Sequence, residues 1–235
     1  MTDSPIGAKS LQWRHYYDHL IERARHDGVT TAEAINRGWA DPRHMADVVR
    51  PYLAPDAIVL EIACGVGRIS RFVAPHCGRL YCADILPDAL NEAKAALAHL
   101  TNVSFQQTNG YDLHEFEPGM FDAVFSFTSF FHFDLELVLQ YFGEITRVLK
   151  AGGVAVIEFK KFSEQPELDQ LVTKIERHGG IESYEAMLDK WRYVSIEMLE
   201  LLCRHCGLQI MNDDVTRFTF RKPASPHASG SALRG

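Results

Sequence analysis

The sequence lacks an apolar run that approaches the roughly 20 residues of a membrane span. Its first residues are polar rather than signal-like, so we expect a cytoplasmic protein without membrane contact. Cysteine is scarce, and its count of five does not suit a disulfide framework, so we expect free thiols. Cys203 and Cys206 have C-x-x-C spacing, but no second pair stands at zinc-finger spacing, so a structural zinc is not expected.

Positive charge is also in short supply. The 235 residues carry 24 Lys and Arg against 31 Asp and Glu, a formal net charge of -7. Nucleic-acid binding needs clustered Lys and Arg, so this balance argues against a nucleic-acid partner and favours a small-molecule substrate. The hydrophobic content of 46% suffices for one core but not for two large ones. We expect a monomer or a homodimer.

The most informative feature present is a glycine-rich bend that follows an apolar run. Residues 58–62 are apolar except for Glu61, and Gly65 and Gly67 come shortly after them. Glycines let the backbone approach a ligand closely, and a helix that begins near Gly67 offers unpaired N–H groups. This pattern predicts a cofactor-binding loop, although a turn of this kind also occurs without a ligand.

A carboxylate stands about 20 residues after the loop, where doubly wound folds bind ribose hydroxyls. It belongs to Asp84, at the end of the short apolar segment 79–84. An ionised carboxylate accepts hydrogen bonds from two neighbouring hydroxyls, so Asp84 is a candidate ribose ligand. Asp84 could instead serve as a helix-start residue ahead of Pro87.

Strand-like and helix-like segments alternate along the chain. This is typical of an α/β fold with a doubly wound, mostly parallel sheet and helices on both faces. We expect seven strands, at 58–62, 79–84, 103–107, 121–127, 154–158, 208–211 and 215–220. We expect helices at about 68–75, 87–99, 134–149 and 195–206. The last two strands should form an antiparallel hairpin, because 215–220 alternates apolar and polar residues.

The helix expected at 134–149 has the clearest pattern. Asp134 is a candidate N-cap, and Gly152 lies past the C-terminal end. Its apolar residues recur at helical spacing and form one stripe that should cover the sheet. They are Leu135, Val138, Leu139, Phe142, Ile145 and Leu149.

In this order, the segments resemble the class I S-adenosylmethionine-dependent methyltransferases, with a match from roughly 51 to 220. The family's first motif is an acidic residue followed by glycine-x-glycine-x-glycine, and segment 61–67 has Ala63 in place of the first glycine. We expect Ala63 to be tolerated with φ below zero, since one methyl group then fits. Asp84 matches the second motif, and the fourth and fifth strands also match the family's patterns.

The resemblance implies S-adenosylmethionine as the cofactor and S-adenosylhomocysteine as its product, bound beyond the carboxyl ends of the strands. It places at the cofactor Tyr16, Glu61, Ala63, Cys64, Gly65, Gly67, Asp84, Ile85, Asn109, Gly110, Tyr111, Ser126 and Phe127. Tyr16 belongs to an N-terminal segment of the kind that folds over the cofactor in small-molecule members. Ordinary helix packing would also explain this tyrosine.

The Asn/Asp-Pro-Pro-aromatic signature of amino-group nucleobase and glutamine methyltransferases is absent after the fourth strand, where 126–129 reads Ser-Phe-Thr-Ser. No acidic pair follows this strand either, so we expect a reaction without a metal. The resemblance therefore implies methyl transfer to a hydroxyl or an amine of a small molecule. A sugar or a secondary metabolite is the favoured class.

His132 is the expected catalytic residue. It follows the fourth strand, in a segment that should face the transferable methyl group. Imidazole suits general base work at neutral pH, and a base is needed for an alcohol but not for an amine that arrives neutral. His132 could instead support the following helix, which Asp134 is expected to cap.

Two segments lie outside the core, and we expect them to carry substrate choice as lids. Residues 1–50 should form an N-terminal helical cap, and 160–193 should form an insertion after the fifth strand of a 51–221 core. The tail 222–235 is rich in Ser, Ala, Gly and Pro and should be disordered. The lid side chains that could reach the pocket are His15, His19, Trp39, Asp41, His44 and His178.

Two other functions stay open. A nicotinamide-dependent oxidoreductase would also use a glycine-rich turn and Asp84. However, Ser70 stands where its third glycine belongs, and no tyrosine has a lysine four residues later. An S-adenosylmethionine-binding protein without methyltransferase activity, such as a regulatory or lyase-like relative, would share every motif described above.

Overall fold

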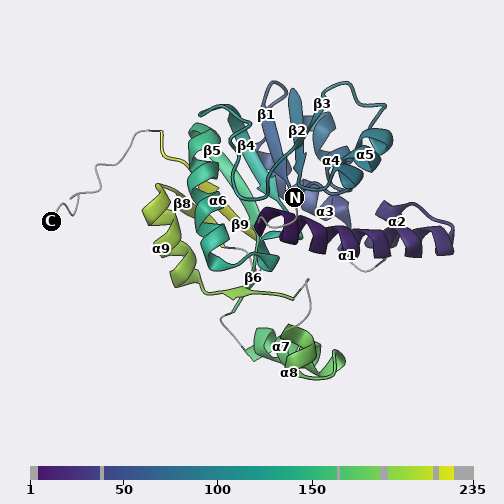
Figure 1. Cartoon of the computed structure of the whole chain (residues 1–235). Helices are drawn as coiled ribbons and strands as arrows, with labels where there is room; N and C mark the ends of the chain where they lie inside the picture. Colours follow the sequence, from purple (N-terminus) through teal and green to yellow (C-terminus); the bar gives the residue numbers. More distant parts are fainter. Residues whose placement is uncertain (1–4, 38–39, 163–164, 186–189, 214–216, 225–235) are drawn as a thin grey trace.

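A seven-stranded sheet runs through the protein. The structure is a computed structural model and describes residues 5–37, 40–162, 165–185, 190–213 and 217–224. The strand order is β3-β2-β1-β4-β5-β9-β8 (Figure 1). The strands are β1 (Ile58–Ile62), β2 (Arg79–Asp84), β3 (Val103–Gln107), β4 (Phe121–Ser126), β5 (Leu149–Glu158), β8 (Gln209–Asp213) and β9 (Arg217–Arg221). Neighbouring strands are parallel, except that β9 runs antiparallel to both β5 and β8. The predicted doubly wound sheet with its antiparallel hairpin is therefore confirmed, although residues 215 and 216 lie outside the described part.

Alternation of side chains along each strand divides the core into two halves. In β1, Leu60 and Ile62 pack on one face of the sheet, whereas Val59 packs on the other. In β4, Val124 and Phe125 are divided in the same way. Because both faces are covered, these central strands carry apolar residues at nearly every position.

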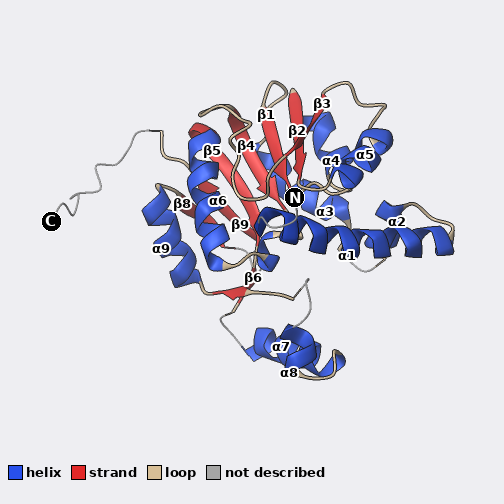
Figure 2. Ribbon diagram, in the orientation of Figure 1, coloured by secondary structure: helices blue, strands red, loops and turns tan. Residues whose placement is uncertain are grey.

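Helices cover both faces of the sheet (Figure 2). One face carries α3 (Pro42–Val49), α4 (Ser70–Val73) and α5 (Pro87–Ala96), and the other carries α6 (Leu135–Val148) and α9 (Ile196–Cys206). The helix predicted at 68–75 is shorter than expected, because the chain tightens after Val73 into a 3-10 turn, η2 (Ala74–His76). The predicted placement of helices on both faces is confirmed.

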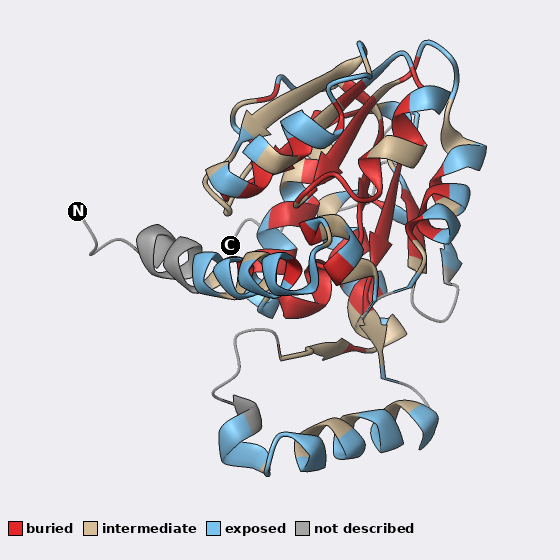
Figure 3. Cartoon of the chain, turned by 90° about the vertical axis from the view of Figure 1, so that its right-hand side faces the viewer, coloured by how far each residue is buried: buried red, intermediate tan, exposed pale blue. Residues whose placement is uncertain are grey.

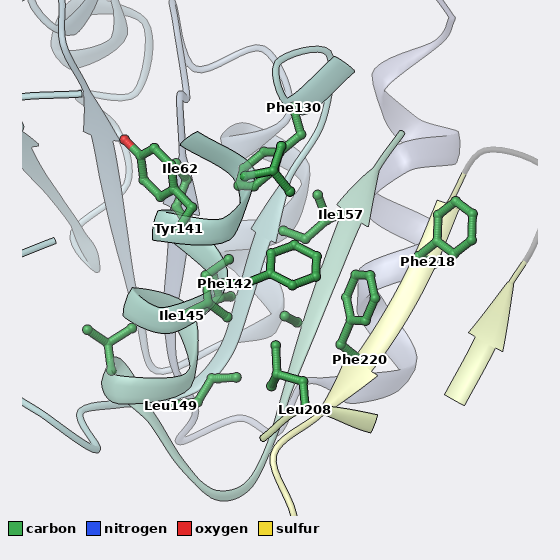
Figure 4. Packing of buried hydrophobic residues seen from close by; sticks show 14 of the residues in the cluster. Ile62, Phe130, Tyr141, Phe142, Ile145, Leu149, Ile157, Leu208, Phe218 and Phe220 are labelled. Carbon is green, nitrogen blue, oxygen red and sulfur yellow. The ribbon is translucent and has the colours of Figure 1, made fainter. Parts of the chain in front are cut away.

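The packing of α6 shows how the sequence positions a covering helix. Phe142 and Ile145 are fully buried and pack in one cluster with Ile157 of β5 and with Phe218 and Phe220 of β9 (Figure 4). Burying a side chain of this kind contributes about 1.5–3 kcal/mol. The helix is thereby fixed against the closing hairpin of the sheet.

Three members of the predicted stripe on α6 behave differently. The side chains of Leu135 and Leu139 are 46% and 38% exposed, because the buried face includes Leu137 and Tyr141 instead. The third, Leu149, begins β5 directly after the helix ends. Burial was wrongly predicted at Leu135 and Leu139, because the buried face is set by the neighbouring elements and not by the stripe alone. Leu149 is buried as predicted, but as a strand residue.

The N-terminal part of the chain forms α1 (Pro5–Asp27) and α2 (Thr31–Asn36) ahead of α3. Thr30 caps α2 in a capping box, since its side chain accepts the N–H of Glu33 and the Glu33 carboxylate accepts the N–H of Thr30. Tyr17 of α1 is buried in one cluster with Val66, which follows β1. This contact holds α1 beside the strand ends (Figure 1), and its action as a lid stays a prediction.

The insertion after β5 consists of β6 (Lys160–Lys161), α7 (Gln165–Arg177), α8 (Ile181–Glu185) and β7 (Tyr193–Val194). β6 and β7 pair in parallel as a separate two-stranded sheet, so the insertion leaves and returns at neighbouring points. α7 and α8 project away from the sheet, and α7, described over its whole length, has no buried residue (Figure 3).

Lys222, predicted to begin a disordered tail, is paired with β5. Its N–H donates to the carbonyl of Gly153 at 3.0 Å, and its carbonyl accepts the N–H of Gly152 at 2.8 Å. Residues 225–235 of the predicted tail lie outside the described residues. Within the described part of the chain, no helix has both the length and the apolar character to cross a membrane.

Candidate functional site

A cavity of about 310 Å³ opens at the carboxyl ends of β1, β2 and β4, next to α1. The predicted site residues that line it are Tyr16, Ala63, Gly65, Asp84, Ile85, Asn109, Gly110, Tyr111 and His132. The predicted residues outside its lining are Glu61, Cys64, Gly67, Ser126 and Phe127. Tyr17, Thr128 and Ser129 also line it and belong to segments that were expected there. Lining residues that sequence reasoning missed include Trp13, Tyr141 and Arg192.

The loop after β1 departs from the expected backbone at Ala63. We predicted φ below zero, but φ is +57°, in the left-handed region. The prediction was wrong because the turn needs the conformation that a glycine adopts freely, whichever residue occupies the position. A non-glycine residue in this region costs about 1 kcal/mol, so the loop is locally strained.

Gly65 and Gly67 are also left-handed, with φ of +54° and +74°, but they serve different purposes. A Cβ atom at Gly65 would meet no heavy atom within 4 Å, so this position faces the open space of the cavity. A Cβ atom at Gly67 would lie 2.9 Å from Cδ1 of Leu97. Gly67 therefore allows close packing behind the loop, while Gly65 leaves room for a ligand.

Asp84 ends β2 with its side chain in the cavity lining. Its Oδ2 accepts the N–H of Gly65 at 2.8 Å, and its Oδ1 accepts the N–H of Leu86 at 2.9 Å. Burial raises the pKa of Asp84, and these N–H donors oppose the rise. Each carboxylate oxygen has a second lone pair that a ligand hydroxyl can use, so Asp84 fits the predicted ribose contact.

Glu61 lies behind the loop. Its side chain is 2% exposed, and the hydroxyl of Ser70 donates to Oε2. Burial raises the pKa of Glu61 to about 8, against the opposing effects of the Ser70 hydrogen bond and the Arg68 charge. Cys64 is likewise buried. Glu61 and Cys64 therefore pack behind the loop, on the side away from the cavity. Their direct contact with a cofactor stays a prediction.

Arg68 joins the loop to the N-terminal segment, a connection that sequence reasoning missed. Its Nη1 donates to Oδ1 of Asn36 at 3.1 Å and to the carbonyl of Ala40 at 2.9 Å. The side chain is buried, so these partners offset part of the cost of removing a guanidinium from water. A single arginine directly after a glycine motif gives no sequence signal of such a distant partner.

The loop after β3 forms another wall. Oδ1 of Asn109 accepts the N–H groups of Tyr111 at 2.8 Å and of Asp112 at 3.0 Å, which makes an Asx turn. Gly110 has φ of +80°, as the turn requires. Asn109 therefore shapes the wall and also lines it.

The end of β4 carries a second strained residue. Ser126 lies behind the cavity, where its hydroxyl donates to the carbonyl of Ile62 at 2.7 Å and ties β4 to β1. Thr128 lines the cavity with φ of +58°, and its N–H donates to Oε2 of Glu158 at 2.8 Å. Strained residues such as Ala63 and Thr128 are common where a backbone meets a ligand.

His132 reaches the cavity on the short turn η3 (Phe130–His132) and is 8% exposed. Its Nδ1 lies 3.3 Å from the carbonyl oxygen of Lys190. Its ring centroid lies 5.3 Å from that of Trp13 of α1. The buried imidazole of His132 therefore lines the same cavity as the glycine loop and the Asp84 carboxylate.

Asp134 occupies the N-cap position of α6, but its side chain does not cap the helix. Its Oδ1 instead accepts the Nε–H of Arg192 at 2.6 Å. Arg192 follows the insertion helices in the chain and also lines the cavity. The predicted side-chain cap was wrong because this charge-assisted hydrogen bond holds the carboxylate.

Two buried tyrosines contribute hydroxyl groups. Burial raises the pKa of Tyr17 and of Tyr141, so both hydroxyls are neutral at physiological pH. The Tyr17 hydroxyl is buried, and the nearby Glu92 carboxylate adds to the rise of its pKa. Both side chains line the cavity and can donate to a ligand.

The remaining predicted lid residues lie elsewhere. Asp41 caps α3, since its Oδ1 accepts the N–H of Arg43 at 2.9 Å. Trp39 lies outside the described residues. The predicted lid histidines are all exposed and lie outside the cavity lining: His15, His19, His44 and His178.

Comparison with known proteins agrees with this geometry. Residues 59–153 match the family model described as a methyltransferase domain. Nodulation protein S of Rhizobium tropici is 24% identical over 173 residues, which cover 73% of this chain and 66% of that protein, just under two thirds of its length.

Two solved structures show the shared fold. A SAM-dependent methyltransferase from Methanosarcina mazei has a TM-score of 0.60 at 18% identity, covering 76% of this chain and 98% of the other. The [4+2]-cyclase SpnF has a TM-score of 0.61 at 16% identity, covering 78% of this chain and 81% of SpnF. Residues 59–153 belong to a class I methyltransferase domain, the type that uses S-adenosylmethionine as its cofactor.

Proposed function

We propose that this protein transfers a methyl group from S-adenosylmethionine to a hydroxyl or an amine of a small molecule. The observation that carries the proposal is that Asp84, the glycine loop and a buried His132 line one cavity. Parallel α/β sheets bind ligands beyond the carboxyl ends of their strands, which is where this cavity lies.

The residues present fit the cofactor. Gly65 leaves room beside the loop, and Asp84 offers lone pairs to a pair of hydroxyls. Tyr16, Ile85 and Tyr111 line the same space and would enclose the nucleoside. When bound, S-adenosylmethionine supplies a methyl group on a positively charged sulfur. The residues of this chain hold it, exclude water and position the acceptor.

His132 would act on the acceptor. A hydroxyl must lose its proton as it attacks, and a neutral imidazole within the cavity can take that proton. Trp13 and Arg192 also line the cavity and would contact the acceptor. A cavity of about 310 Å³ would have to hold the cofactor and the acceptor together, which favours a small acceptor such as a sugar or a secondary metabolite.

The proposal includes a cytoplasmic monomer or homodimer without a nucleic-acid substrate. The net charge of -7 supports the exclusion of nucleic acid. All five cysteines are free thiols, which is usual in a reducing compartment.

A second candidate is a protein that binds S-adenosylmethionine without transferring its methyl group, since this fold also occurs in a protein named for another reaction, the [4+2]-cyclase SpnF. Incubation with methyl-labelled S-adenosylmethionine and a panel of hydroxyl and amine metabolites separates the two. The proposed function predicts label in a product, in stoichiometry with S-adenosylhomocysteine. Tight cofactor binding with no labelled product across the panel would favour the second candidate.

With a hydroxyl acceptor, His132→Ala should lower turnover by roughly 100-fold and leave S-adenosylhomocysteine affinity unchanged. His132→Asn keeps a polar side chain without a usable base and should do the same. Wild-type activity should fall as pH drops, because a base must be neutral to accept a proton. Wild-type turnover in both variants would show that His132 is structural.

A further inference from the structure

We propose that residues 190–192, which follow the insertion helices, are positioning residues that hold His132 in the tautomer with its proton on Nδ1. Only the use of His132 as a base rests on the proposed function. The contacts themselves join a segment of the insertion to the turn that carries His132.

The first contact fixes the tautomer. Nδ1 of His132 lies 3.3 Å from the carbonyl oxygen of Lys190. A carbonyl oxygen accepts hydrogen bonds and cannot donate them, so Nδ1 must carry the proton in the neutral ring. The lone pair then belongs to Nε2, which is the atom that can act as a base.

The second set of contacts fixes the backbone around the ring. The N–H of Arg192 donates to the carbonyl of Phe131 at 2.7 Å, and its Nη1 donates to the carbonyl of His132 at 2.8 Å. Its Nε donates to Asp134 at 2.6 Å. One residue therefore binds Phe131, His132 and Asp134, and the paired charges of Arg192 and Asp134 strengthen the last bond.

Trp191 adds a third contact between the same two segments. Its ring centroid lies 6.1 Å from that of Phe131, in an edge-to-face arrangement. The ammonium of Lys160 lies 5.0 Å from the Phe131 ring and 4.4 Å from the Trp191 ring, so one cation contacts both. Each of the three residues 190–192 thus touches the turn that carries His132.

These contacts give the insertion a defined task. An imidazole on a short turn can rotate, and either nitrogen can carry the proton, unless a neighbour selects one state. Side chains in working sites are held by such supporting contacts. Arg192 also lines the cavity, so the segment that orients His132 borders the space where the acceptor would lie.

The test measures the His132 tautomer by ¹⁵N NMR of histidine-labelled protein, at a pH where the ring is neutral. Arg192→Met removes the side-chain hydrogen bonds and keeps the length of the side chain. Arg147→Met is the matched control, because Arg147 also donates to a carboxylate, that of Glu144, and to two backbone carbonyls, at the other end of α6.

We expect the Nδ1–H tautomer in the wild type and in Arg147→Met, and a mixture of tautomers in Arg192→Met. Arg192→Lys keeps the charge and one donor, so its share of the Nδ1–H tautomer should lie between those of the wild type and Arg192→Met. It replaces Arg192→Met in the test if that variant does not fold. Once an acceptor is known, Arg192→Met should lower kcat at least roughly tenfold with S-adenosylhomocysteine affinity within about twofold.

Two results would overturn the inference. One is an Nε2–H tautomer in the wild type, and the other is a His132 tautomer that is the same in both Arg192 variants as in the wild type. That outcome is distinct from failure of the proposed function. If His132→Ala keeps full turnover while Arg192→Met still changes the tautomer, the positioning is real and the base assignment is wrong.

Discussion

At the scale of single residues, Ala63 shows a position where the fold accepts strain. Its φ of +57° is the conformation that glycine adopts without cost, and Ala63 lines the cavity. Ala63→Gly should therefore raise the free energy of unfolding by about 0.5 kcal/mol, because relief of this strain outweighs the greater freedom of glycine in the unfolded chain. Urea denaturation measures the change.

Ala95 provides the matched control for this substitution. It lies exposed in α5 with ordinary helical geometry. Ala95→Gly should lower the free energy of unfolding by about 0.5–1 kcal/mol, so the two substitutions should have opposite signs. A loss of stability in Ala63→Gly equal to that in Ala95→Gly would show that the loop is not strained.

Glu61 should make the stability of the fold depend on pH. Burial raises its pKa from 4.5 to about 8, so between these values the folded protein keeps a proton that the unfolded chain releases. Its contribution to stability is therefore fully present below pH 4.5 and is lost as pH rises toward 8.

Glu61→Gln keeps an acceptor for Ser70 and removes this titration. The stability of the wild type relative to Glu61→Gln should fall by about 1 kcal/mol for each pH unit in that window. Denaturation at several pH values gives both curves. Parallel curves for the two proteins would mean that Glu61 titrates near its ordinary value.

At the scale of elements, α1 and α7 differ from the helices that cover the sheet. α7 has no buried residue over its described length, and α1 borders the cavity through Trp13, Tyr16 and Tyr17. Backbone amides of both helices should exchange hydrogen faster than those of β1 and β4 in the free protein. S-adenosylhomocysteine should slow exchange in α1.

Hydrogen exchange followed by mass spectrometry resolves these segments. The buried helix α6 is the internal control and should stay protected with and without ligand. Equal protection of α1 in both states would indicate a preformed, permanently closed site, and the predicted lid action would then be wrong.

Element boundaries followed from the sequence where local chemistry decides them. Ser195 caps α9 and Gly207 ends it with φ of +76°, as their residue types indicate. The side chain of Asp134 was misjudged, because its partner Arg192 lies 58 residues away. Local patterns carry no information about a competing partner that only the tertiary fold brings near.

At the scale of the whole molecule, the sheet and the proposed cofactor side of the cavity could be predicted, because glycine and carboxylate positions are tied to strand ends. Asp84 and Gly65 line the cavity as expected. The proposed acceptor side could be predicted only at His132. Trp13 and Arg192 come from segments outside the motif, and no spacing rule connects them to it.

The central claim is that this cavity holds S-adenosylmethionine with Asp84 at its ribose, and calorimetric titration with S-adenosylhomocysteine tests it most directly. The wild type should bind one molecule per chain and should not bind NAD. Asp84→Ala should weaken binding by about 1.5–3 kcal/mol, because buried hydroxyls lose a charged acceptor. Asp88→Ala, whose exposed carboxylate lies outside the cavity lining, should bind as the wild type does. Unchanged affinity in a folded Asp84→Ala variant, or no binding by the wild type, would contradict the account.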